Sequence, residues 1–213
     1  MARALTISGR NGGWYFLKNP HLFSIRNAGG LSKTTNNDII ITMNVIIVTN
    51  RLLLRTFTID DAHLIYDLNA DSNVTRFTFD PVTDPGQAKE ILEKVILPQY
   101  ALYNHGRWAV HLKLDLEFIG WCGLKYRPER NEVDLGYRFK RSAWNNGYAT
   151  EAAYACLKYG FEKLNMGKIT GRAIPENIGS CRVLEKIGMQ FIREESVDGH
   201  WARTYELSNP FIR

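Results

Sequence analysis

The feature that most constrains the fold is a switch in the period of the apolar side chains along residues 107–164. Residues 107–113 and 131–140 alternate apolar and polar side chains, which is typical of strands, and residues 118–126 read as a strand between them. From Ala149 to Leu164 the apolar residues recur at the spacing of one helix face. We therefore expect a sheet whose third strand in this block leads into a long helix.

Elements predicted on either side of this block complete the pattern of a layered fold. They are a strand at 51–58, a helix at 59–69, a helix that begins at Asp84 and Pro85, a strand at 168–174, a helix at 177–187, and strands at 189–195 and 201–207. A chain of 213 residues is long enough for one domain with one core. The order of elements predicts an α/β (α+β) fold, with a mixed sheet and helices on its faces.

Residues 1–45 differ from the rest of the chain, because they are rich in glycine and asparagine and show no sustained period. We expect them to be an N-terminal extension that is disordered or that arises from a start codon set too early, with Met43 as the next methionine. A targeting peptide is a third reading, since transit peptides are basic and poor in acidic residues. Residues 46–213 would then form the functional domain.

The charge distribution argues against nucleic-acid binding. The chain has a formal net charge of +5, but residues 1–37 hold five basic side chains and no acidic one, so residues 38–213 are neutral overall. No apolar run approaches the roughly 20 residues of a membrane-spanning helix. The three cysteines, Cys122, Cys156 and Cys181, are scattered, so we expect buried reduced thiols, no metal, no nucleic-acid or membrane partner, and a cytoplasmic location.

Residues 141–152 are the segment best suited to bind a ligand, because they lie between a predicted strand and a predicted long helix. The first N–H groups of a helix lack intrahelical partners and carry a partial positive charge, which attracts anions. Gly147 lacks the Cβ that would obstruct such an approach. An ordinary polar turn remains the alternative reading of this segment taken alone.

Three ordered blocks resemble the GNAT N-acetyltransferases. Residues 144–152 (Trp-Asn-Asn-Gly-Tyr-Ala-Thr-Glu-Ala) are similar to motif A as it reads in the RimJ/RimL-like branch, Trp-Gly-x-Gly-Tyr-Ala-Thr-Glu-Ala, and depart from it at Asn145, where we expect a looser loop. Residues 177–189 resemble the family's Asn-x-x-Ser-x-x-Val-x-x-Lys-x-Gly-Phe block, and residues 132–137 resemble the strand beside the pantetheine arm. The resemblance covers about residues 50–210.

The resemblance implies the GNAT fold, a mixed central sheet of about seven strands splayed at its centre with about four helices on its faces. It also implies acetyl-CoA as co-substrate, bound where the strands at 131–140 and 168–174 separate. Strand backbone would pair with the pantetheine arm, and loop amides would hold the pyrophosphate. The implied cofactor-binding residues are Tyr137, Arg138, Phe139, Trp144, Asn145, Asn146, Gly147, Tyr148, Ala149, Thr150, Asn177 and Lys186.

Two of these residues can also be interpreted as having a structural role and no contact with the cofactor. Asn177 is among the best residues for a helix N-cap and can take that role instead of contacting the cofactor. Lys186 can be a solvated lysine on a helix face instead of a phosphate ligand.

The resemblance also suggests residues for proton transfer. Ser180 aligns with the position that donates a proton to the leaving sulfur, although a serine in a first helical turn often bonds backbone instead. Glu195 resembles the glutamate that precedes a turn in the RimL-like branch and is the favoured general base, with Glu132 as its rival. A surface glutamate without a catalytic role is the alternative for each.

The implied reaction is transfer of an acetyl group from acetyl-CoA to a primary amine by direct attack in a ternary complex. We expect a protein or peptide α-amine, because its pKa of about 7.7–8.0 leaves roughly a tenth neutral at pH 7, whereas a lysine amine near 10.4 is almost wholly protonated. The alternatives are a small-molecule amine such as a polyamine, amino acid or antibiotic, and a non-catalytic acetyl-CoA-binding module. The pattern leaves open whether the protein is a monomer or a dimer.

Overall fold

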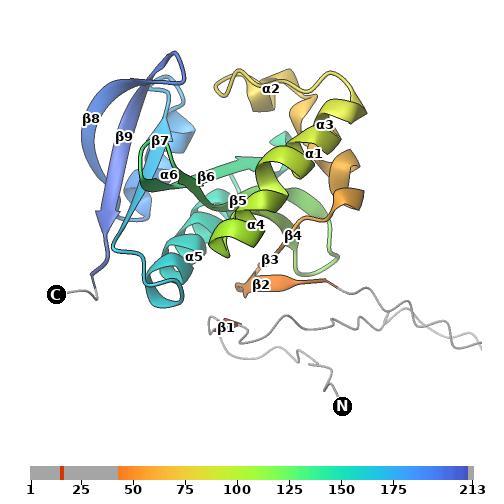
Figure 1. Ribbon diagram of the computed structural model, residues 1–213, viewed down its shortest axis with the longest axis horizontal. Helices are drawn as coiled ribbons and strands as arrows, with labels where there is room; N and C mark the ends of the chain where they lie inside the picture. Colours follow the sequence, from red (N-terminus) through yellow and green to blue (C-terminus); the bar gives the residue numbers. More distant parts are fainter. Residues whose placement is uncertain (1–14, 17–42, 211–213) are drawn as a thin grey trace, which may run out of the picture.

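The computed structural model describes residues 15–16 and 43–210, which form one nine-stranded mixed sheet with helices on both faces (Figure 1). The strand order is β1-β2-β3-β4-β5-β6-β7-β9-β8, and every neighbouring pair is antiparallel except β6 and β7. The predicted α/β (α+β) layer fold is confirmed.

The strands follow the predicted order, with two additions near the start of the chain. They are β1 (Tyr15–Phe16), β2 (Val45–Val48), β3 (Leu52–Arg55), β4 (Arg107–Leu112), β5 (Phe118–Arg127), β6 (Glu132–Phe139), β7 (Lys168–Ala173), β8 (Gln190–Val197) and β9 (His200–Ser208). The additions β1 and β2 extend the sheet beyond β3, so the described residues hold nine strands where about seven were expected.

The helices also match the predicted pattern, with extra short pieces. They are η1 (Ile59–Asp61), α1 (Ala62–Asn69), α2 (Ser72–Thr75), α3 (Pro85–Ile91), the π-helical turn η2 (Leu92–Ile96), α4 (Leu97–Tyr103), η3 (Arg141–Ala143), α5 (Tyr148–Glu162) and α6 (Ile178–Lys186). The predicted start of α3 is confirmed, because the Asp84 side chain accepts hydrogen bonds from the backbone N–H groups of Gly86 and Gln87. Such a cap stabilises a helix by about 1 kcal/mol.

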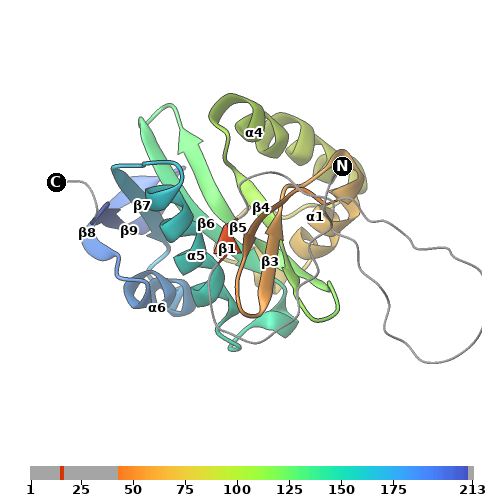
Figure 2. The same ribbon diagram turned by 90° about the horizontal axis from the view of Figure 1, so that it is seen from below.

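The sheet separates two apolar clusters. Figure 2 shows α5 and α6 on one side of the sheet and α1 and α4 on the other. On one face, α5 and α6 bury Trp108, Leu124 and Leu135. On the other face, α1, α3 and η2 cover Phe57 and Ala109. Alternation along β6 therefore sends apolar side chains toward α5 and sends charged ones, such as Asp134 and Arg138, toward the opposite face.

The prediction for residues 1–45 lies mostly outside the described residues. The exceptions are β1, which pairs antiparallel with β2 through Tyr15 opposite Val48 and Phe16 opposite Ile47, and residues 43–45 at the start of β2. The prediction of buried thiols is confirmed, since Cys122, Cys156 and Cys181 are all buried and free of disulfides. Within the described residues, no helix is long and apolar enough to span a bilayer, and no group of three or more metal-binding side chains occurs.

Candidate active site

The two parallel strands at the centre of the sheet stay together over a short distance only. Asp134 is paired with Thr170 and Leu135 with Gly171, and no later pair joins β6 to β7. Residues 136–139 pair with β5 alone. The Thr170 hydroxyl donates to the Val133 carbonyl oxygen at 3.1 Å and helps to hold the joined end. Beyond this point, β6 leaves one edge open to an extended ligand.

The loop after β6 leads to a helix N-terminus that no side chain caps. Gly147 is the N-cap of α5, with a φ of 77°, and it makes no side-chain capping bond. The first intrahelical bond runs from the N–H of Glu151 to the carbonyl oxygen of Gly147. The amides of residues 148–150 therefore remain available to an anion.

Asn145 also lies in the left-handed region, with a φ of 62°. Glycine favours this region, and asparagine tolerates it better than most side chains. The Asn146 side chain braces the same turn by donating to the Trp144 carbonyl oxygen at 2.9 Å. At Asn145 the loop therefore has a backbone conformation that glycine also adopts readily.

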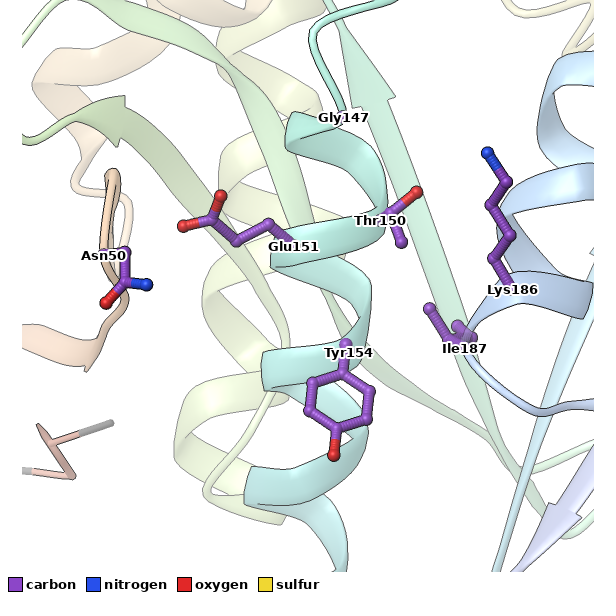
Figure 3. Close-up of a pocket in the computed structure, with 7 residues that line it drawn as sticks. All are labelled: Asn50, Gly147, Thr150, Glu151, Tyr154, Lys186 and Ile187. Carbon is purple, nitrogen blue, oxygen red and sulfur yellow. The ribbon is translucent and has the colours of Figure 1, made fainter. Parts of the chain in front are cut away.

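A pocket of about 530 Å³ opens beside this helix start (Figure 3). Its lining consists of Asn50, Gly147, Thr150, Glu151, Tyr154, Lys186 and Ile187. Figure 3 shows Glu151 turned toward Asn50 on one side of α5, and Thr150 turned toward Lys186 of α6 on the other. Lys186 thus lines the same pocket as Gly147 and Thr150 at the uncapped start of α5.

Arg51 and Glu151 form an ion pair at the start of α5 that the sequence analysis did not single out. Arg51 lies in the turn between β2 and β3, and its Nε is 2.6 Å from Oε2 of Glu151 in the first turn of α5. Its Nη1 also donates to the Asn146 carbonyl oxygen at 2.9 Å. Because the two residues are separated by 100 positions, only the folded chain reveals that they meet.

The hydroxyl group of Ser180 is hydrogen-bonded to the hydroxyl group of Tyr137, which belongs to the part of β6 that is not paired with β7. The two hydroxyl oxygens are 2.9 Å apart, and the Tyr137 hydroxyl also lies 3.0 Å from the Ser180 carbonyl oxygen. Burial raises the pKa of Tyr137 well above its usual range, so this phenol stays protonated at neutral pH. Asn177 acts as the N-cap of α6, since its Oδ1 accepts from the Ser180 N–H at 3.2 Å.

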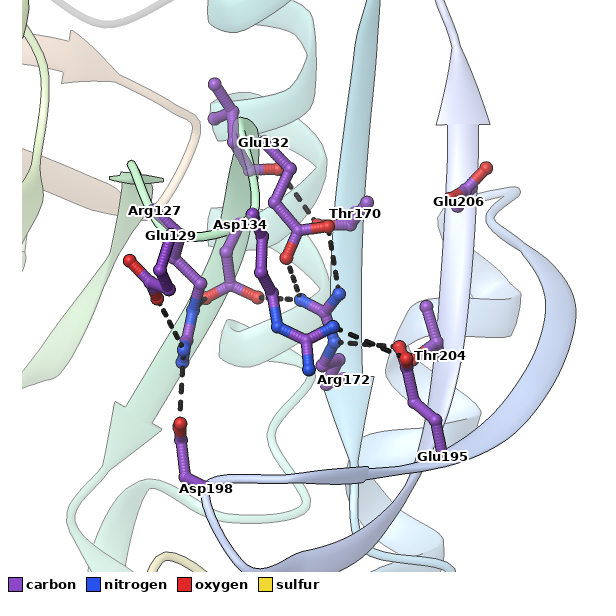
Figure 4. Close-up of polar contacts among 12 residues, drawn as sticks. Arg127, Glu129, Glu132, Asp134, Thr170, Arg172, Glu195, Asp198, Thr204 and Glu206 are labelled. Carbon is purple, nitrogen blue, oxygen red and sulfur yellow. Dashed lines mark hydrogen bonds and ion pairs between the residues drawn. The ribbon is translucent and has the colours of Figure 1, made fainter.

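Glu195 and Glu132 both bind arginines (Figure 4). Arg172 lies between them, 2.7 Å from Glu132 and 3.5 Å from Glu195, with its side chain only 7% exposed. Glu195 also accepts from the Thr204 hydroxyl at 2.7 Å and from Arg130 at 3.3 Å. These hydrogen bonds, together with the nearby arginine charges, lower the pKa of Glu195 to about 2. A carboxylate this acidic is a weak base, so the geometry argues against the favoured role of Glu195.

Asp134 is the third carboxylate in the same network, and it too is paired. Its Oδ2 lies 2.6 Å from Arg107, and its Oδ1 lies 3.6 Å from Arg172. Arg107 also donates to the carbonyl oxygens of Gly123 and Asp134. Glu132, Asp134 and Glu195 are therefore all paired with arginines.

The side chains of two other candidate cofactor-binding residues, Arg138 and Trp144, are hydrogen-bonded to other parts of the protein. Arg138 binds Asp80 at 2.7 Å and Asn69, on the sheet face opposite α5. The indole N–H of Trp144 donates to the Phe139 carbonyl oxygen at 2.9 Å, which ties the loop to the end of β6. Contacts from these residues to a cofactor would therefore come mainly from their backbone groups.

Known proteins share both the sequence and the fold. A family model described as an acetyltransferase (GNAT) domain matches residues 51–190. The uncharacterized N-acetyltransferase YnaD of Bacillus subtilis is 36% identical over 149 residues, 68% of this chain and 82% of that protein. The uncharacterized protein YkkB of the same organism is 43% identical over 91 residues, 42% of this chain, so this chain matches only 53% of that relative's length. A solved GNAT-family acetyltransferase from Bacillus anthracis is 26% identical with a TM-score of 0.65, covering 75% of this chain and 96% of that one.

More distant structures share the fold alone. One is a spermidine N-acetyltransferase from Vibrio cholerae in complex with CoA and spermine, 19% identical with a TM-score of 0.62, covering 74% of this chain and 95% of that chain. Another is RimL, a ribosomal L7/L12 α-N-protein acetyltransferase in complex with coenzyme A, 15% identical with a TM-score of 0.65, covering 77% of this chain and 97% of that chain. Their acceptors differ, so likeness of fold does not indicate the acceptor of this chain.

Proposed function

The chain belongs to the GNAT acetyltransferase family and is an acetyl-CoA-dependent N-acetyltransferase; we propose that its acceptor is the α-amino group of a protein or peptide. The observation that carries this proposal is the pairing of three carboxylates near the junction of β6 and β7, on the sheet face opposite α5. Glu132, Asp134 and Glu195 each pair with an arginine, so each of these carboxylates already binds a cation. An enzyme with this arrangement suits an amine that is already partly neutral near pH 7, as an α-amine is.

In the proposed complex, the pantetheine arm lies along β6 where β7 has separated from it, and the pyrophosphate meets the amides of residues 148–150. The two-pair junction of β6 and β7 and the uncapped start of α5 support this arrangement. Lys186 would add a positive charge on the α6 side of the pocket. The thioester would then lie near the divergence point, where an amine can approach from the face opposite α5.

The proposed reaction is direct attack of the amine nitrogen on the thioester carbonyl carbon. A C–N bond forms, the C–S bond breaks, and CoA leaves as a thiolate that accepts a proton from the Ser180 hydroxyl, which regains a proton from solvent. The hydrogen bond between Tyr137 and Ser180 orients that hydroxyl. The proton lost by the amine passes to solvent, and positioning of the two reactants supplies much of the rate.

The same proposal assigns the chain to the RimJ/RimL-like branch, on the strength of the Trp144–Ala152 block, and to the cytoplasm, on the strength of its three buried free cysteines. A polyamine acceptor is the main alternative. Its several ammonium groups need unpaired carboxylates for binding, and the paired state of Glu132, Asp134 and Glu195 disfavours it.

Thiol release from acetyl-CoA with a small panel of acceptors tests the proposal. The panel holds a lysine-free peptide with a free N-terminus, an Nα-acetylated peptide with one lysine, spermidine, and a free amino acid. We expect the first peptide to react fastest, with a rate that rises between pH 7 and pH 8 as the α-amine loses its proton. A faster reaction with spermidine or the amino acid would establish the small-molecule alternative instead.

A further inference from the structure

Glu151 stands in an unfavourable place for a protein that binds a pyrophosphate. It belongs to the first turn of α5 and lines the pocket together with Gly147 and Thr150. A carboxylate at a helix N-terminus stabilises the helix by interacting with its dipole. The same negative charge repels a phosphate bound a few ångströms away. Binding of CoA therefore requires this charge to be offset.

Arg51 supplies the opposite charge and also contacts Asn146 and Tyr148 on either side of Gly147. Its Nε contacts Glu151 Oε2 at 2.6 Å, and its Nη1 donates to the Asn146 carbonyl oxygen at 2.9 Å. Its guanidinium group also lies over the Tyr148 ring, 4.6 Å from the ring centroid. One side chain thus connects the last loop residues before Gly147 with the first turn of α5.

The turn between β2 and β3 fixes the position of Arg51. The backbone N–H of Arg51 donates to Glu151 Oε1 at 3.0 Å, and the Thr49 hydroxyl donates to the same oxygen at 2.6 Å. The Leu52 N–H donates to the Thr49 hydroxyl oxygen at 2.8 Å, which closes the turn. Three donors converge on one carboxylate, so its side chain is only 12% exposed and cannot turn away from the pocket.

We propose that Arg51 is a positioning residue for acetyl-CoA, acting by neutralising Glu151 and by holding the Asn146 carbonyl group away from the bound pyrophosphate. The inference rests on the proposed placement of the pyrophosphate at residues 148–150. It predicts that most of the loss of CoA affinity in an Arg51 variant comes from the unpaired charge of Glu151. Removal of that charge should then restore most of the affinity.

The test is a double-mutant cycle on the full chain, with the dissociation constant of CoA measured by calorimetric titration. Arg51→Met should raise this constant about five- to tenfold, because it leaves a carboxylate unpaired beside the phosphates. Glu151→Gln should leave it unchanged or lower it, since the amide keeps an acceptor oxygen for Thr49. The double variant should recover most of the loss.

A substrate without phosphates separates this role from general stabilisation of the fold. The KM for acetyl-CoA should rise in Arg51→Met, while turnover of acetyl-pantetheine and the KM for the amine should stay at wild-type values. Lys168→Met is the matched control, because it removes an ion pair of similar exposure with Glu206, at 3.2 Å, at the start of β7. This control should bind CoA normally.

Two results would overturn the inference. They are a double variant that binds CoA no better than Arg51→Met, and an equal loss of turnover with acetyl-pantetheine. Gly147→Val identifies which idea has failed. If this variant weakens CoA binding while Arg51→Met does not, the phosphate site stands and the role of Arg51 is refuted. If neither variant affects CoA, the placement of the pyrophosphate is itself wrong.

Discussion

The hydroxyl oxygens of Tyr137 and Ser180 lie 2.9 Å apart, although the residues are separated by 43 positions in the chain. Tyr137 belongs to β6 just beyond its last pair with β7, and Ser180 belongs to the first turn of α6. Two protonated hydroxyl groups therefore meet beside the open edge of the sheet. This is the place where a departing thiolate would need a proton.

Replacement of Ser180 by alanine should lower kcat about ten- to a hundredfold, which is near the low end for general acid catalysis because a thiolate leaves readily. The KM for acetyl-CoA should change little, since the hydroxyl acts on sulfur only as charge develops there. Steady-state kinetics with saturating amine measure both values. A rise in KM with unchanged kcat would make Ser180 a binding residue instead.

Tyr137→Phe tests whether the phenol orients that serine. It removes the hydroxyl and keeps the ring, so packing on the α5 side of the sheet should survive. We expect a smaller fall in kcat than for Ser180→Ala, and no additional fall when both changes are combined, because the tyrosine acts through the serine. Additive losses in the double variant would show that the two hydroxyls act independently.

Gly147→Val should weaken CoA binding much more than it lowers stability. The φ of 77° is costly for a β-branched residue, by about 1–3 kcal/mol, and the new side chain would stand at the proposed phosphate site. Gly199→Val is the matched control, since Gly199 has a similar φ of 83° and a Cβ there meets nothing within 4 Å. Titration with CoA and thermal melting of both variants separate binding from folding. Normal affinity in a folded Gly147→Val protein would refute the phosphate-loop assignment.

Glu195 should contribute to the stability of the fold at neutral pH more than to catalysis. Its folded pKa of about 2 lies below its ordinary value of 4.5, so its contribution is fully present above pH 4.5 and is lost as the pH falls toward 2. We expect Glu195→Gln to melt lower than wild type at pH 7, with the difference narrowing below pH 4.5 and closing near pH 2. The pH–rate profile of Glu195→Gln, and that of Glu132→Gln, should keep its wild-type shape. A flattened profile in either variant would restore that glutamate as the general base.

Phe79 offers a test of the acceptor side that leaves the cofactor site untouched. It lies between α2 and α3, is 51% exposed, and stacks on His200 of β9 with ring centroids 3.8 Å apart. The stack joins two segments at the face opposite α5, from which the amine is proposed to approach. Phe79→Ala should change the KM for a peptide amine severalfold and leave the KM for acetyl-CoA unchanged. The reverse pattern would place the stack on the cofactor side.

The periods and the blocks in the sequence were enough to predict the fold class and the loop at residues 144–150. Both are local features, because a strand, a helix face and a glycine in a left-handed turn are specified by neighbouring residues. The start of α3 at Asp84 was predicted for the same reason. The short strand β2 was not predicted, since four apolar residues beside a polar segment carry no clear period.

Only the tertiary structure decided what the charged side chains do. Glu195 reads as a candidate base in the sequence, but Arg172 of β7, Arg130 of the turn between β5 and β6, and Thr204 of β9 converge on it and make it a weak base. Arg51 carries no local signal at all, and its partner lies 100 residues away. The pKa of a carboxylate depends on the charges and donors within a few ångströms, and folding alone determines which distant residues these are.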